Sequence, residues 1–567
     1  MRTGHRERFG ACGSATLGFA RIGLVLLVLV AVPAFAQEKA TLTVLFTSDM
    51  HAHVLPFDDV RQKPASGSIA QAATVIARIR GENPRTVVLD GGDAIEGTPL
   101  GYYAIAASGA GGQDPTIAAM NIVGYDASVL GNHEFNFGLD VLRRSLEQAR
   151  FPWLAANLAG AKEVHLPVEG EVMVVRGGVR VGVLGLTNPN VPHWDPPSHW
   201  RSLEFLDPVT VAGARLAGLR ARSDVVIVVV HSGFERDPNS GAPDGSESEN
   251  FAWRLAQLDG IDLLLTGHTH RDIPPRALEK TVVAQPGRWA DVVSRVDLQL
   301  AKGEGGWRVT GWRGENLKTA GEEPNPQVVA AVAAAQERAV AELARPLGEL
   351  TVPLRVVALP TSDDPAVDLI HVVQLEATDA QLSLAAPLGG GRVEFPAGPV
   401  TPRLAHALYP YPNTLVVVRL TGSQLRDVLE HAVRGWVGLE CGGAETTLRR
   451  DPALPSYNYD TLEGATYFVD PASPVGQRIR GLRVAGKEVQ PEESFTVAIN
   501  SYRAVGGGGY PHLAAAPRVK EIDRPMVDLI VEYLARHRKV TPAADENWSF
   551  TVPLREAPAP KPRPVTP

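Results

Sequence analysis

Several side chains that can bind a metal ion or move a proton directly follow short apolar runs in this sequence. They are Asp49, His51, His53, Asp93, Asn132, His133, His231, His268 and His270. Carboxylate, imidazole and amide oxygen together suit Zn, Mn, Fe or Co better than Ca or Mg. The set is too large for one tetrahedral ion. It fits two divalent ions about 3.5–4 Å apart that share one carboxylate.

The local spacing of these residues indicates that they point into one crevice. Asp49 and His51 are two positions apart, which places them on the same side of an extended chain, and "GHTH" repeats this spacing. A glycine precedes Asp93, Asn132 and His268, where it would let the backbone turn tightly. Taken alone, a histidine at a strand end is more often a satisfied polar residue than a ligand.

The apolar runs before these residues are typical of buried strands. "LTVLFTSDMHAH", "RTVVLDGGDA", "YDASVLGNHE", "SDVVIVVVHSG" and "GIDLLLTGHTH" each pass from Val, Ile or Leu to a polar cluster. Helical segments are expected between them, at residues 68–80, 140–148 and 208–221. This alternation predicts an α/β domain over residues 41–320. Open α/β sheets gather their ligands at the carboxyl ends of the strands, where the polar clusters lie.

The length and composition predict a second domain. The chain has 567 residues, 44% of them hydrophobic, which suffices for at least two cores. A linking helix is expected at residues 325–345, with Asn325 as its cap and Pro326 in its first turn. An α+β domain then covers residues 350–553, with a helix at 365–378 and strands in "NTLVVVRL" and "SFTVAIN". The net charge of −8 argues against a nucleic-acid polymer as partner.

The two ends of the chain have compositions of their own. Residues 1–36 read as an export signal, because arginines precede an apolar run that ends in "AFA". That run is short for a membrane span, which needs about 20 apolar residues, although a retained N-terminal anchor is the alternative. We therefore expect a periplasmic or extracellular monomer with no stable membrane span after signal removal. Only Cys441 remains in the mature chain, so no intrachain disulfide can form. Residues 557–567 form a proline-rich, extended or disordered tail.

The chemistry-bearing motifs occur in a familiar order. "SDMH", "GGDAIEG", "GNHEF", "VVVHSG" and "GHTH" resemble the calcineurin-like metallophosphoesterases, and nearly the whole mature chain resembles the exported 5′-nucleotidase family. The resemblance implies a four-layer α/β metallophosphoesterase domain followed by an α+β 5′-nucleotidase C-terminal domain. It also implies a metal-dependent enzyme that hydrolyses small nucleotide phosphoesters.

The resemblance further assigns roles to the candidate residues. One ion would be held by Asp49, His51, Asp93 and His270. The other would be held by Asp93, Asn132, His231 and His268. His133 would be the catalytic histidine that faces the scissile phosphate, and Asn132 would also touch a phosphate oxygen. His53 could line the site without binding an ion.

One position separates branches of this family. Many 5′-nucleotidases carry an aspartate three residues after the catalytic histidine, whereas this chain has Asn136. With "EGTPLGYY", "ALYPYPNTLVV", "SYRAVGG" and "TPAADENW", this resembles the 2′,3′-cyclic-nucleotide 2′-phosphodiesterase/3′-nucleotidase branch. The alternatives are a 5′-nucleotidase or nucleotide-sugar hydrolase, and a non-catalytic nucleotide-binding protein.

The resemblance places the base pocket in the second domain. Tyr411 and Tyr502 match the two aromatic residues that stack on the nucleobase, and Tyr457 and Tyr459 are further candidates. Tyr411 could instead be an ordinary core residue, and Tyr502 could plug the glycine-rich loop. Arg392, after a glycine-rich turn, matches a substrate-binding arginine, but a solvated arginine would fit the position as well.

Overall fold

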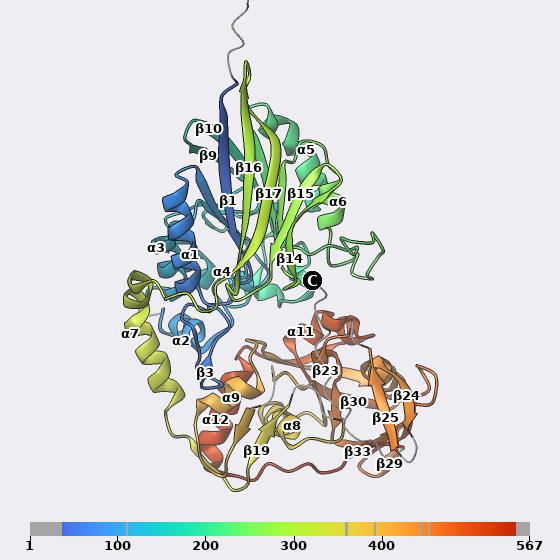
Figure 1. Cartoon of the computed structure of the whole chain (residues 1–567). Coiled ribbons are helices and arrows are strands. Elements are labelled where there is room, and N and C mark those ends of the chain that lie inside the picture. The colour runs from blue at the N-terminus through green and yellow to red at the C-terminus, as the bar shows by residue number, and fades with distance from the viewer. Residues whose placement is uncertain are drawn as a thin grey trace, which may run out of the picture. The chain divides into compact units, whose positions relative to one another are not determined.

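The structure is a computed structural model that describes residues 37–108, 112–357, 361–389, 393–442, 445–451 and 454–551 (Figure 1). The predicted export signal (1–36), Arg392 and the predicted tail (557–567) lie outside these residues. Within the described ranges, no helix combines the length and the apolar character that crossing a bilayer requires.

Two sheets form the framework of the N-terminal part. The first has the order β17-β16-β1-β4-β5-β6-β8, and the second has the order β14-β15-β13-β12-β10-β9. The strands of the first are β1 (Lys39–Thr47), β4 (Thr86–Asp90), β5 (Ala127–Val129), β6 (Trp153–Leu154), β8 (Val168–Glu169), β16 (Val292–Gly303) and β17 (Gly306–Lys318). The strands of the second are β9 (Glu171–Arg176), β10 (Val179–Leu186), β12 (Val225–Val230), β13 (Leu263–Thr266), β14 (Asp272–Leu278) and β15 (Thr281–Pro286). The strands that precede the candidate ligands pair in parallel within each sheet.

Helices cover the outer faces of both sheets, as Figure 1 shows. The helices of this part are α1 (Ile69–Glu82), α2 (Pro99–Ser108), α3 (Pro115–Val123), α4 (Leu139–Gln148), α5 (Pro208–Arg220) and α6 (Ala252–Ala256). The three helices expected from the sequence are α1, α4 and α5, with ends within two residues of those predicted.

The side chains of β12 show how the layers are built. Val225, Ile227 and Val229 join the apolar core between the two sheets. Val226 and Val228 point the other way, into a core shared with α5 and α6. A third core packs α1, α3 and α4 against the first sheet. The layers are therefore helix, sheet, sheet and helix, and the predicted four-layer α/β fold is confirmed.

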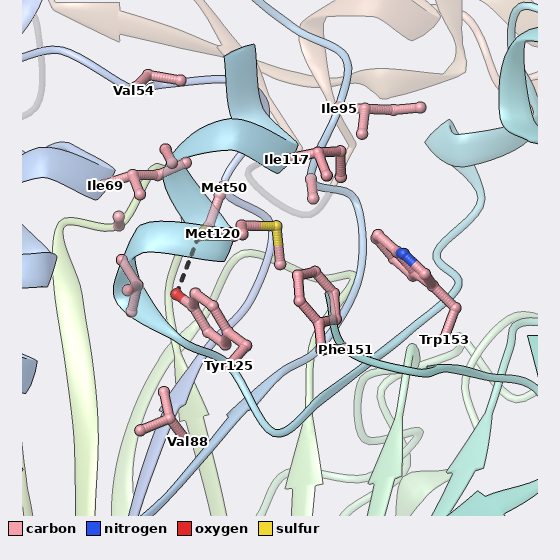
Figure 2. Packing of buried hydrophobic residues seen from close by; sticks show 14 of the residues in the cluster. Met50, Val54, Ile69, Val88, Ile95, Ile117, Met120, Tyr125, Phe151 and Trp153 are labelled. Carbon is pink, nitrogen blue, oxygen red and sulfur yellow. Dashed lines mark hydrogen bonds between the residues drawn. The ribbon is translucent and has the colours of Figure 1, made fainter. Parts of the chain in front are cut away.

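The core beneath α3 also anchors the first candidate loop. Met50, between Asp49 and His51, is fully buried and packs in the cluster that contains Met120 and Phe151 (Figure 2). The hydroxyl of Tyr125 lies 3.6 Å from the Met50 sulfur and 2.8 Å from Thr47 Oγ1. The loop that follows β1 is thus fixed by packing rather than left free at the surface.

The predicted linking helix is present as α7 (Pro326–Leu343). The side chain of Asn325 accepts hydrogen bonds from the N–H groups of Gln327 and Val328, as its predicted cap role requires. Val328 and Val332 are buried in the same core as α1 and α3.

The C-terminal part contains smaller sheets and a second set of helices. Its five-stranded sheet has the order β26-β20-β30-β23-β31, and a four-stranded sheet has the order β29-β28-β27-β33. The strands of these two sheets are β20 (Leu382–Ala385), β23 (Leu415–Thr421), β26 (Thr461–Glu463), β27 (Ala465–Val469), β28 (Ile479–Val484), β29 (Lys487–Glu488), β30 (Ser494–Asn500), β31 (Arg518–Ile522) and β33 (Trp548–Phe550). The helices are α8 (Pro365–Thr378), α9 (Pro402–Leu408), α10 (Gly422–Ala432), α11 (Ser501–Ala504) and α12 (Met526–His537). The helix predicted at 365–378 and the strand predicted in "SFTVAIN" are confirmed residue for residue.

Candidate metal centre

The ends of five strands deliver the candidate ligands. Asp49 and His51 follow β1, Asp93 follows β4, and Asn132 and His133 follow β5 in the first sheet. In the second sheet, His231 follows β12, and the pair His268 and His270 follows β13. Because the parallel strands of each sheet end at the same edge, residues far apart in sequence come together there.

The backbone at these positions is unusual. Asp49, His51, Asp93, His268 and His270 all adopt left-handed φ angles, from 48° to 71°. The extended-chain explanation for the spacing of Asp49 and His51 is therefore wrong, although the two side chains do converge. Non-glycine residues occupy this region at a cost and persist there when surrounding packing holds them, which is common at functional sites.

Glycines precede Asp93, Asn132 and His268, and the sequence predicts that they let the backbone turn tightly. Two of them serve a different purpose. Neither Gly131 nor Gly267 has a positive φ. A Cβ on Gly131 would lie 2.2 Å from Asp93 Oδ1, and one on Gly267 would lie 2.2 Å from Ser48 Oγ. These glycines make room for close approach of the loops.

The candidate ligands form two clusters. Asp49, His51 and His270 offer ligand atoms that all lie within 4.8 Å of one another, and Asp93, His231 and His268 do the same. In the first cluster, the Nε2 atoms of His51 and His270 are 3.0 Å apart. His270 Nε2 is 3.5 Å from Asp49 Oδ1.

Asp93 and Asn132 complete the second cluster and connect it to the first. Asp93 Oδ2 lies 3.0 Å from His231 Nε2 and 4.0 Å from His51 Nε2, so one carboxylate oxygen stands between the clusters. Asn132 Oδ1 is 3.2 Å from His231 Nε2 and 3.0 Å from His268 Nδ1. An amide oxygen, a carboxylate and two imidazoles thus converge around this second cluster.

The hydrogen bonds of the histidines fit metal ligation. His231 Nδ1 donates to the carbonyl oxygen of Gly91 at 2.6 Å, and His51 Nδ1 donates to that of Glu96 at 3.1 Å. His268 instead uses Nε2, which donates to the Glu249 carboxylate at 2.9 Å. In each case the other ring nitrogen faces the cluster with its lone pair available, which is the usual arrangement of a metal-bound histidine. The donor set therefore suits divalent metal ions.

His133 lies beside the clusters but belongs to neither of them. Its ring is 5.1 Å from that of His51. Its Nδ1 is 2.6 Å from Asn136 Oδ1 and 3.3 Å from Glu96 Oε2. Burial alone would lower the pKa of His133, but the Asp93 and Glu96 carboxylates outweigh burial and raise this pKa well above its usual value.

Sequence reasoning missed several residues that hold the ligand loops. The carboxylate of Glu134, fully buried, accepts hydrogen bonds from the backbone N–H groups of Asp93 (2.8 Å), Ala94 (2.6 Å) and Gly131 (2.6 Å). Glu96 and Glu249 contact His133 and His268 as described above. Glu134 and Glu96 occur within "GNHEF" and "GGDAIEG", so their motifs could have identified them, whereas no pattern in the sequence distinguished Glu249.

A cavity of about 270 Å³ opens beside the first cluster. It is lined by His51, His133, His270, Glu96, Arg288 and Tyr411, among others. His53 also lines it, with its ring stacked on Trp289 at 4.7 Å rather than in either ligand cluster. Tyr411 is half-buried, and burial together with the nearby Glu96 raises its pKa to about 12.

The other tyrosine candidates differ in exposure. Tyr457 and Tyr502 are half-buried, and burial is the largest cause that raises the pKa of each; the nearby Glu249 carboxylate raises both further. Tyr502 rests on Gly507, where a Cβ would lie 2.5 Å from three ring atoms. Tyr459 is a core residue, because it is only 4% exposed and packs against Trp436.

Two protein-family models match the chain. A model of calcineurin-like phosphoesterases covers residues 42–272, which contain both ligand clusters. A model of the 5′-nucleotidase C-terminal domain covers residues 346–515. The chain joins a calcineurin-like phosphoesterase domain to a 5′-nucleotidase C-terminal domain.

Known relatives resemble this two-domain phosphoesterase along most of its length. The 2′,3′-cyclic-nucleotide 2′-phosphodiesterase/3′-nucleotidase of Yersinia enterocolitica is 29% identical over 92% of this chain and 90% of that protein. The trifunctional nucleotide phosphoesterase protein YfkN of Bacillus subtilis is 30% identical over 93% of this chain, which spans 40% of YfkN. A crystallised Staphylococcus aureus protein described as a 5′-nucleotidase superposes with a TM-score of 0.78 at 26% identity, covering 90% of this chain and all of that one.

The fold and the ligand clusters agree with each other. The chain matches the calcineurin-like phosphoesterase model over the residues that contain both clusters, and the donor atoms of these clusters suit divalent metal ions. The chain is a metal-dependent phosphoesterase.

Proposed function

We propose that the enzyme hydrolyses nucleotide phosphoesters, opening 2′,3′-cyclic nucleotides to 3′-nucleotides and then releasing the 3′-phosphate to give nucleosides. The observation that carries this proposal is the position of His133. It lies beside two ligand clusters and lines the same cavity as Tyr411. A phosphate could therefore reach the clusters and His133 while its nucleoside extends toward an aromatic residue.

The proposal includes two divalent ions, of Zn, Mn, Co or Fe. Asp49, His51, Asp93 and His270 would hold one, and Asp93, Asn132, His231 and His268 would hold the other. Support comes from Asp93 Oδ2, which stands between His51 and His231 where a shared carboxylate is required. When bound, such a pair of ions supplies an activated water at neutral pH and neutralises charge on the phosphoryl oxygens.

The remaining steps use residues of the chain. His133 donates a proton to the departing ribose oxygen, since an alkoxide is a poor leaving group without one. The amide of Asn132 hydrogen-bonds a phosphoryl oxygen and so orients the phosphorus for in-line attack. For a cyclic substrate the first cycle breaks the bond to the 2′-oxygen, and a second cycle removes the phosphate from the 3′-oxygen.

Tyr411 and Tyr502 form the proposed base site. Stacking on aromatic side chains contributes about 1–3 kcal/mol per base and accepts any base, because each base has a π-face. Tyr457 is a third half-buried tyrosine close to both, and the neighbouring Tyr502 and Tyr411 raise its pKa further after burial. Arg392 is proposed to add positive charge near the substrate.

Preference for cyclic and 3′-nucleotides over 5′-nucleotides rests on Asn136 and on the Yersinia enterocolitica relative, whose name carries the first two activities. A 5′-nucleotidase or nucleotide-sugar hydrolase is the second candidate, favoured by the likeness to the Staphylococcus aureus structure. We also propose that residues 1–36 direct export and that the enzyme acts in the periplasm or outside the cell.

A substrate panel tests the proposal. The purified chain without residues 1–36, loaded with Zn or Mn, is assayed on 2′,3′-cyclic AMP, 3′-AMP and 5′-AMP. We expect the first two to be turned over faster than the third.

The metal centre is tested by two variants. Asp93→Ala should abolish turnover and lower the bound metal, whereas Asp140→Ala, which changes an exposed carboxylate on α4, should retain turnover and bound metal. Faster turnover of 5′-AMP would replace the proposed preference with the second candidate. An Asp93→Ala enzyme with full activity and metal content would contradict the two-metal centre.

A further inference from the structure

We propose that Asp195 is a positioning residue that acts through Asn136 to fix which ring nitrogen of His133 faces the substrate. This inference rests on the proposed function of His133 as a proton donor. Asp195 lies 59 residues from Asn136 in sequence, in the loop after β10, and it belongs to neither of the two ligand clusters described above.

The hydrogen bonds define the chain of contacts. Asn136 Nδ2 donates to Asp195 Oδ1 at 2.9 Å and lies 3.2 Å from Asp195 Oδ2. On the other side of the same amide, Asn136 Oδ1 lies 2.6 Å from His133 Nδ1. Asn136 is therefore held between a carboxylate and an imidazole.

The chemistry of these groups allows only one orientation of the Asn136 side-chain amide. An ionised carboxylate accepts hydrogen bonds and cannot donate, so the amide must turn its NH₂ group toward Asp195. The amide oxygen then faces His133, and because it can only accept, His133 Nδ1 must carry a hydrogen. Glu96 Oε2, 3.3 Å from the same nitrogen, is a second acceptor and favours the same arrangement. Nε2 is then the ring nitrogen left for the substrate.

Asp195 is itself held in place. It is 3% exposed, its backbone carbonyl accepts a hydrogen bond from Trp200 Nε1 at 3.0 Å, and its Oδ1 lies 3.2 Å from His199 Nδ1. A buried carboxylate with fixed partners can orient an amide more firmly than solvent can. The arrangement also accounts for a functional amide at position 136, since an aspartate there would place a second carboxylate against Asp195.

The first test uses leaving groups of different quality. A ribose oxygen needs a proton as it departs, whereas p-nitrophenolate departs without one. General-acid catalysis contributes ~10²–10⁴-fold to the rate. A misoriented His133 should lose part of this contribution, so we expect kcat to fall about tenfold. We expect Asp195→Ala to show this loss on 3′-AMP with little change in KM, and to keep the wild-type kcat on p-nitrophenyl phosphate. Asp195→Asn retains an acceptor oxygen and should recover most of the activity on 3′-AMP. Asp140→Ala is the matched control and should resemble the wild type on both substrates.

A double-mutant cycle provides the second test. If Asp195 acts through Asn136, adding Asp195→Ala to an Asn136→Ala enzyme should cost almost nothing further in kcat on 3′-AMP. Equal losses on 3′-AMP and p-nitrophenyl phosphate would overturn the inference, and so would losses that multiply in the double variant. If the wild type rejects 3′-AMP, the proposed substrate is wrong, and the same comparison is made on 5′-AMP, whose leaving group is also an alkoxide.

Discussion

Gly507 supports the ring of Tyr502 directly. A Cβ at this position would meet three ring atoms at 2.5 Å, although the backbone itself would accept alanine because φ is not positive. The glycine-rich loop "AVGGGGYP" therefore contributes a flat surface on which an aromatic ring can lie. The sequence raised the possibility that Tyr502 plugs the glycine-rich loop, and the structure identifies Gly507 as the glycine that its ring contacts.

Replacing Gly507 by alanine tests the role of that ring. The new methyl group should displace Tyr502 and weaken base stacking, which is worth about 1–3 kcal/mol. We expect KM for 3′-AMP to rise ~10-fold, since 1.4 kcal/mol corresponds to a factor of ten. KM for p-nitrophenyl phosphate, which has no base, should stay the same. Gly213→Ala on α5, where a Cβ meets nothing within 4 Å, is the control. A parallel rise for both substrates would argue against Tyr502 as part of the base site.

At the level of secondary structure, the helix α8 places a buried acid in a group of like charges. Asp363, Asp368 and Asp545 offer carboxylate oxygens within 4.8 Å of one another. Burial, with the neighbouring Asp363 and Glu463, raises the pKa of Asp368 to about 8. The folded state therefore holds a proton that the unfolded chain, with an ordinary pKa near 3.8, releases. The free energy of unfolding should fall as pH rises from about 4 to about 8.

Asp368→Asn should remove this loss of unfolding free energy at high pH, because the amide does not ionise. We expect the variant to be more stable than the wild type above pH 8, with the difference shrinking toward pH 4. Urea unfolding at several pH values measures this difference in the free energy of unfolding. A chelator in the buffer ensures that no divalent cation offsets the repulsion between the carboxylates. Asp379→Asn at the exposed C-cap of the same helix is the control and should show no such trend. A constant difference between variant and wild type at all pH values would contradict the assignment.

Regular strands and helices were more predictable from the sequence than the loops between them. Strands such as β12 were predictable because unbroken Val and Ile runs suit burial on both faces, and α8 was predictable from its capping Asp364 and the Pro365 that follows. That the candidate ligands gather at one edge was predictable because they follow such strands. Asp195 and Glu249 were not, because their contacts depend on how loops between elements fold back, and no periodic pattern encodes that. The left-handed backbone of the ligand loops was likewise invisible in residue types alone.

At the scale of the whole molecule, the proposed centre draws on five chain segments that span residues 49–270. An unfolded chain cannot bring these segments together, so bound metal should stabilise the folded state specifically. Ligand at 100 times its Kd contributes about 2.7 kcal/mol.

Metal removal should therefore destabilise the enzyme. We expect dialysis against a chelator to lower Tm by ~5 °C or more, and added Zn or Mn to restore it. His231→Ala, which lacks one proposed ligand, should show a smaller response to the chelator. Calorimetry with metal analysis measures both. An unchanged Tm after complete removal of metal would mean that the clusters form without any ion and that a bound ion does not stabilise the fold.

The left-handed backbone at Asp49, His51, Asp93, His268 and His270 has a consequence for evolution. Among residues that coordinate ions through oxygen or nitrogen, Asp, Asn and His tolerate this conformation far better than longer or bulkier side chains. Exchange of Asp49 for glutamate would thus be penalised by stereochemistry before coordination enters. Few residue types are therefore available at these five positions. Selection for a different metal would more readily change the residues around the candidate ligands than the candidate ligands themselves.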